Sequence, residues 1–95
     1  MPVFAVEYTY DNRAAERDAV RPEHRAFLRA LHETGALLAS GPFEGGASAL
    51  LVVVAADDAA ARDLLTGDPF AAAGLLADVR VRPWSPVIGV FAHLV

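Results

Sequence analysis

Strand-like and helix-like patterns alternate along this chain, and their order limits the folds that it can adopt. Residues 3–10 alternate in polarity with Phe4, Val6 and Tyr8 on one face, as in a strand that is buried on one side. In residues 22–34 the large apolar side chains instead recur at helical spacing. The chain is therefore predicted to begin with a strand followed by a helix.

The later segments continue this alternation. The elements predicted from them are, in order, a short strand at 36–40, a central strand at 47–55, a helix at 57–65, a short helical segment from 68, a half-buried strand at 78–82 and a last apolar strand at 87–95. The order is β-α-β-β-α-β with an extra C-terminal strand. It predicts an α+β, ferredoxin-like subunit whose antiparallel sheet carries its helices on one face.

The composition suggests how the other face of this sheet is covered. The 95 residues suffice for a single domain spanning 1–95, yet 55% of them are hydrophobic. Apolar surface in such excess often lies against a partner subunit. We therefore expect a homodimer that pairs through the sheet face.

Several classes of function conflict with the composition. The chain has no cysteine, and all eight basic residues are arginine, so thiolate, disulfide and lysine Schiff-base chemistry are not expected. A net charge of −4 argues against nucleic-acid binding. No apolar run reaches the roughly 18–20 residues of a membrane span, and the start resembles no export signal. We expect a cytoplasmic protein without metal or organic cofactor.

His24 stands where a core residue belongs. Phe27, Leu28 and Leu31 follow it at the three-, four- and seven-residue spacing of one helical face, so the imidazole is expected to point inward. Either it is a structural histidine that donates to a carbonyl, or it is a general acid/base in a small pocket. With Pro22 in the first turn of the helix, the positive helix terminus would favour the neutral, basic form of the ring.

Each of the other candidate site residues also has an ordinary structural explanation. Asp68 before Pro69 is a helix-capping signature, although a capping carboxylate can still hold an imidazole. The segment Ser40-Gly41-Pro42 is either a plain turn or a place where a ligand approaches the backbone. Arg21 could clamp a substrate carboxylate or lie in solvent. Of the remaining histidines, His32 falls outside the apolar stripe and is expected to be solvent-exposed, and His93 lies in the last predicted strand.

Together these segments resemble the YCII-related (YciI-like) family. The resemblance rests on the segment Arg21–Leu31, the segment Gly35–Pro42, Asp68-Pro69-Phe70 with Gly74, and Val79-x-Val81-x-Pro83-Trp84. It implies a dimeric α+β barrel with a pocket in each subunit. It also implies His24 and Asp68 as catalytic residues, with Ser40, Gly41 and Pro42 lining the pocket and Arg21 near its mouth.

The resemblance leaves the chemistry open. Members resemble muconolactone isomerases in fold, and one branch is assigned the dehydrochlorination of a chlorinated hydroxyhydroquinone. The first hypothesis is a cofactor-free enzyme in which His24 moves a proton on a lactone or a hydroxylated or halogenated ring. The second is a non-catalytic dimer that binds a small ligand, and a cofactor-free monooxygenase is a third possibility without specific support in the sequence.

Overall fold

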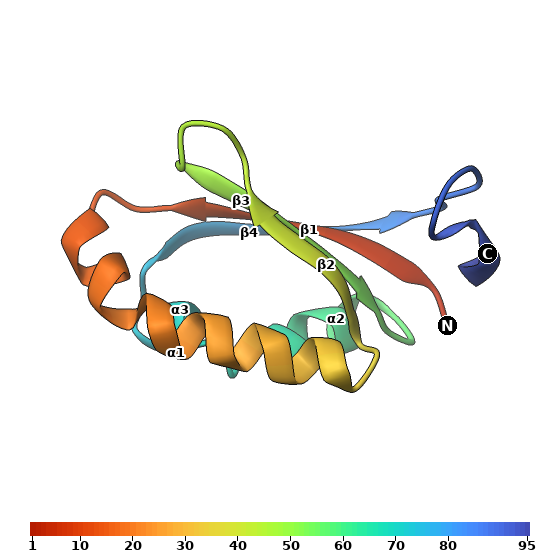
Figure 1. The fold of residues 1–95 in the computed structure, drawn as a ribbon, viewed down its shortest axis with the longest axis horizontal. Helices are drawn as coiled ribbons and strands as arrows, with labels where there is room; N and C mark the ends of the chain where they lie inside the picture. The colour runs from red at the N-terminus through yellow and green to blue at the C-terminus, as the bar shows by residue number, and fades with distance from the viewer.

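A computed structural model describes residues 1–95 as one antiparallel sheet with its helices on a single face (Figure 1). The sheet order is β2-β3-β1-β4. The elements are β1 (Val3–Tyr10), α1 (Ala14–Glu33), β2 (Leu37–Pro42), β3 (Ser48–Val54), α2 (Asp58–Leu65), α3 (Pro69–Ala72), β4 (Leu76–Trp84) and the 3-10 helix η1 (Ala92–Leu94). The predicted ferredoxin-like α+β subunit is confirmed. No helix is both long and apolar enough to cross a bilayer.

The core lies between the sheet and the helices. Alternate residues of β1, among them Val6 and Tyr8, point to the helix side, and Val6 pairs with the fully buried Leu51 of the central strand β3. Leu28 of α1 and Leu65 of α2 close the layer from the other side. At about 25 cal/mol per Å² of apolar surface, burial of such side chains is the main force that holds the two layers together.

The first helix begins earlier than the sequence predicts. The sequence predicts Pro22 in its first turn, whereas α1 starts at Ala14 and contains Pro22 in its interior. Arg17 explains part of this difference. Its guanidinium donates to the main-chain oxygen of Asp11 and lies 4.8 Å from the centre of the Tyr10 ring, which ties the first turns to the end of β1.

The two edge strands are longer than predicted, and both contain proline. The strand predicted to end at residue 40 continues to Pro42 in β2, and the strand predicted to end at residue 82 continues through Pro83 to Trp84 in β4. Both strands are at the edges of the sheet, where one side of the backbone has no neighbour. Proline lacks an N–H donor and is tolerated in such edge strands.

The predicted C-terminal strand at 87–95 is wrong. Trp84 already pairs with Val3, the first residue of β1, so the chain beyond β4 has no strand beside it. Pro86 and Gly89, whose φ of 116° lies in the left-handed region, interrupt the apolar run, and it ends in η1. The segment is instead bent and exposes large side chains, with Ile88 92% exposed.

Candidate functional site

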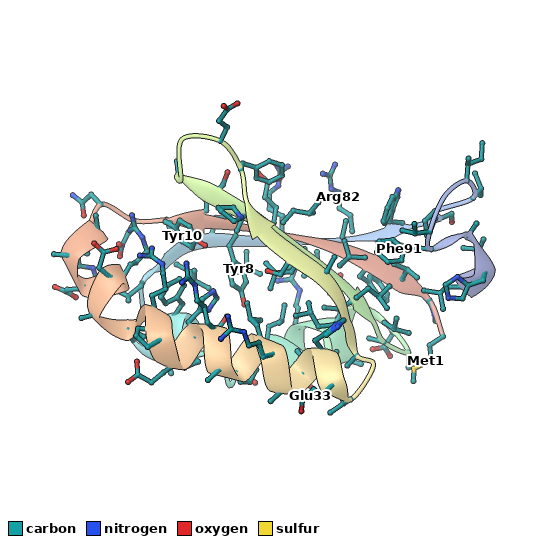
Figure 2. The ribbon with its side chains drawn as sticks, viewed as in Figure 1. Met1, Tyr8, Tyr10, Glu33, Arg82 and Phe91 are labelled. Carbon is teal, nitrogen blue, oxygen red and sulfur yellow. The ribbon has the colours of Figure 1, made fainter.

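A cavity of about 560 Å³ opens between α1 and the edge strand β2. Its size lies within the range of small-ligand pockets. Tyr8 and Tyr10 reach from β1 into the space between the sheet and α1 (Figure 2). Five of the predicted site residues line this cavity: Arg21, His24, Ser40, Gly41 and Pro42. The sixth, Asp68, is completely buried behind His24.

His24 contacts Asp68 through one ring nitrogen. The His24 Nδ1 atom lies 2.7 Å from Asp68 Oδ1, although 44 positions separate the two residues in the chain. The imidazole also stacks on Phe70, with ring centres 3.8 Å apart and an angle of 5° between the planes. The carboxylate and the aromatic ring therefore fix both the position and the plane of the imidazole.

Asp68 accepts three hydrogen bonds inside the protein. Its Oδ1 accepts from the backbone N–H of Phe70 at 3.0 Å and from His24, and its Oδ2 accepts from the Tyr8 hydroxyl at 2.9 Å. Asp68 is therefore both a helix cap and the partner of the imidazole, because the oxygen that caps α3 also contacts His24. A buried carboxylate is stable only with such partners.

The Tyr8 hydroxyl keeps its proton in this site. Burial and, next, the neighbouring Asp68 carboxylate raise the pKa of Tyr8 well above its ordinary value. Burial also raises the pKa of Tyr10, while Arg21 and Arg17 act in the opposite direction. Tyr8 is therefore a permanent donor to Asp68, which leaves that carboxylate as an acceptor for His24.

This network determines which nitrogen of His24 carries the hydrogen. An ionised carboxylate can only accept, so Nδ1 carries the hydrogen and the neutral ring has its lone pair on Nε2. No hydrogen bond within the chain involves Nε2. It is also not fully buried, because the only fully buried side-chain nitrogen or oxygen without a hydrogen-bond partner is Nε of Arg17. Nε2 is thus reachable from the cavity that His24 lines.

The expected influence of the helix terminus does not apply. Since α1 begins at Ala14, His24 lies more than two turns inside the helix. The effect of the helix dipole is confined to the first and last turns. The orientation and tautomer of His24 depend instead on Asp68 and Phe70, which both belong to the start of α3.

Sequence comparison identifies the family. A model of the YCII-related domain matches residues 1–85. The chain belongs to the YCII-related domain family. Among curated proteins, no sequence matches this chain. The resemblance noted in the sequence is therefore confirmed over most of its length.

A solved structure shares the fold of this YCII-related chain. It is 5-chloro-2-hydroxyhydroquinone dehydrochlorinase (TftG) from Burkholderia phenoliruptrix AC1100, in complex with 2,5-dihydroxybenzoquinone. The two chains superpose with a TM-score of 0.75 and 22% sequence identity, over 86% of this chain and 92% of the other. The likeness shows that the ferredoxin-like fold extends to a small-molecule enzyme.

Residues not singled out from the sequence complete the site. Tyr8 was assigned only to an inward strand face, and Phe70 only to a motif. The signal for Tyr8 is general, because a tyrosine on a buried face usually has a partner for its hydroxyl. His32 is exposed, as predicted, but it also lines the cavity and contacts the Leu37 carbonyl oxygen through Nδ1 at 2.8 Å.

The charged groups of this YCII-related domain do not form a metal centre. Nowhere do three or more His, Asp or Glu side chains gather closely enough to hold an ion. The cavity wall instead carries arginine, with Arg21 at its rim in an ion pair with Asp18. The arrangement provides one imidazole with a free basic nitrogen, in a pocket whose lining includes apolar side chains and three arginines.

Proposed function

We propose that this chain is a small acid/base enzyme that needs no cofactor. Its substrate would be a lactone or a hydroxylated or halogenated ring, and its reaction an isomerisation or an elimination such as dehydrochlorination. The observation that carries the proposal is the His24 ring, which is held by Asp68 through Nδ1 and leaves Nε2 reachable from the cavity. A histidine needed only for structure has no reason to face an open cavity with its basic nitrogen.

In the proposed reaction Nε2 of His24 takes a proton from the bound substrate. The imidazolium then carries its positive charge 2.7 Å from the Asp68 carboxylate, which Tyr8 and Phe70 hold in place through their hydrogen bonds. In an isomerisation His24 returns the proton to another atom of the substrate. In a dehydrochlorination the electron pair released by deprotonation forms the new π bond, and chloride leaves with the electrons of the carbon–chlorine bond.

The rate enhancement that one histidine can supply limits how weakly acidic the substrate can be. One positioned acid/base group contributes roughly 10²–10⁴-fold to a rate. Such a contribution suits a substrate whose proton is already acidic, for example one beside a carbonyl or on a hydroxylated ring. The dehydrochlorinase with the shared fold acts on a ring of this type, which supports the choice of substrate class.

The experiment combines a matched pair of histidine substitutions with two assays. Chloride release from 5-chloro-2-hydroxyhydroquinone tests elimination, and deuterium incorporation into a panel of lactones and hydroquinones tests proton transfer. We expect His24→Gln to lower turnover by about 10²–10⁴-fold without changing the fold. His93→Gln alters an exposed histidine of η1 and should leave turnover unchanged. Full turnover in the His24 variant would contradict the proposal.

A non-catalytic role for the same cavity is the second candidate. The cationic rim favours it, since Arg21 and His24 could bind a small anion without chemistry. Product analysis after incubation separates the two, because only an enzyme changes its ligand. For both candidates we propose a homodimer formed through the outer face of the sheet, where Leu50 of β3 is 37% exposed.

A further inference from the structure

Charge is distributed unevenly around the cavity. The chain contains 12 acidic residues and eight arginines, yet no aspartate or glutamate lines the cavity, whereas three of the arginines do. These three are Arg21, Arg25 and Arg29, and His24 and His32 also line the wall. An acidic protein has thus placed three arginines, and no aspartate or glutamate, in the wall of this pocket.

The arginines belong to a longer row that begins at the N-cap of α1 and continues along the helix. The arginines at the far end of this row have no acidic partner. Residues 13, 17, 21, 25 and 29 are all arginine, at steps of four, which place side chains about 6 Å apart along one side of a helix. The first two pair with Asp11 and the third with Asp18. Arg25 and Arg29 form no ion pair, although Glu33 follows Arg29 by four residues.

An unpartnered row of this kind is unfavourable without a ligand. Like charges four residues apart repel each other on a helix surface. An anion between the two guanidinium groups would remove this repulsion, and the planar forks of arginine match carboxylate and phosphate oxygens. The apolar side chains of Leu28 and Leu51, which also line the cavity, would then contact the body of the same ligand.

We infer that the substrate is an organic anion whose carboxylate or phosphate group binds to Arg25 and Arg29. The apolar body of the ligand then extends over Leu28 toward Nε2 of His24. This inference rests on the proposed function, because it takes the cavity as the substrate site, and it adds the charge of the substrate. The anion is assigned to Arg25 and Arg29, which form no ion pair, rather than to Arg21, whose guanidinium already pairs with Asp18.

Equilibrium binding tests the inference without requiring turnover. The probes are salicylate, phenyl phosphate and the neutral salicylamide, titrated into the full chain by calorimetry. We expect at least one anion to bind about tenfold more tightly than salicylamide, and added salt to weaken that binding. The comparison between the two anions shows whether a carboxylate or a phosphate is preferred.

Matched arginine substitutions locate the contact. Arg25→Gln and Arg29→Gln should each reduce the preference for the anion by about fivefold or more. Arg13→Gln and Arg62→Gln are the controls, because these arginines are also exposed but do not line the cavity. They should leave all affinities unchanged.

Three results would overturn the inference: no anion binding up to about 10 mM, equal binding of anion and amide, or an anion preference that survives in both Arg25→Gln and Arg29→Gln. The proposed function is judged separately by the turnover of His24→Gln. Turnover that depends on His24 without any anion preference would refute only the inference. An anion preference without turnover would refute only the enzymatic function.

Discussion

Charged groups have partners at one end of the cavity and lack them at the other. At the inner end, both oxygens of Asp68 accept hydrogen bonds, and the carboxylate is completely buried. At the rim, Arg25 and Arg29 are exposed and have no ionic partner. The inner end is therefore complete without a ligand and can hold a ring in a fixed geometry. In the proposed function, the inner end orients the imidazole and the arginines of the rim recognise the charge of the ligand.

The largest effect on this comparison is expected from removing the carboxylate at the inner end. Asp68→Ala deletes three hydrogen bonds and leaves the Tyr8 hydroxyl unpaired in the core, so we expect a loss of about 3–5 kcal/mol in the free energy of unfolding. Urea denaturation measures it. Asp57 is the control, because it caps α2 through one hydrogen bond only, and Asp57→Ala should cost about 0.5–2 kcal/mol. Equal losses would show that Asp68 is no more than a cap.

A smaller loss with a distinct pH dependence is expected for Tyr8→Phe. At neutral pH the variant leaves one oxygen of Asp68 unpaired, which costs about 1–3 kcal/mol. The pKa of Tyr8 is raised in the folded state, so above pH of about 10 the unfolded chain releases this proton while the folded one keeps it. The stability contribution of Tyr8 is therefore complete below pH of about 10 and decreases as the pH rises further.

Urea titrations at several alkaline pH values follow this difference. The wild-type and Tyr8→Phe stabilities should converge as the pH increases. Tyr10→Phe is the matched control, since its pKa is also raised but its hydroxyl forms no hydrogen bond within the chain. That variant should lose little at neutral pH. Parallel curves for wild type and Tyr8→Phe would contradict the assigned role of burial.

The smallest effect is expected at the rim, and it has the opposite sign. Arg25→Gln removes repulsion from Arg21 and Arg29, so the free energy of unfolding should rise by about 0.2–0.5 kcal/mol. Arg62 of α2 pairs with Asp58 four residues before it, and Arg62→Gln should lower stability by about 0.3–0.5 kcal/mol. Thermal unfolding at low salt compares the two. A destabilised Arg25 variant would show that the rim arginine supports the fold rather than the ligand.

Local sequence patterns predicted the strands of the sheet correctly, but not where α1 begins or what the C-terminal segment forms. Alternation in β1 and the apolar run of β3 gave the sheet, because burial on one face or both leaves a direct trace in the sequence. The start of α1 and the fate of residues 87–95 depend on distant contacts. Arg17 holds the first helical turns against β1, and the apolar C-terminal run has no strand to pair with.

The site was predictable in its members but not in its contacts. The inward face of His24 and the capping position of Asp68 follow from spacing and local chemistry. Their 2.7 Å contact joins positions 44 residues apart, and the hydrogen bond from Tyr8 to Asp68 spans 60. No local pattern encodes such distances. The sequence shows the rim arginines as residues, but only the fold shows that Arg25 and Arg29 line the cavity and lack ionic partners.

The shared oxygen of Asp68 has a consequence for how variants of this protein would survive selection. Because Oδ1 both starts α3 and steers the imidazole, a library sorted only for well-folded molecules would retain aspartate at this position even if no member were active. Replacement of His24 removes one contact of that oxygen and leaves the cap in place. Tolerance at position 24, rather than at 68, would therefore distinguish selection for chemistry from selection for folding.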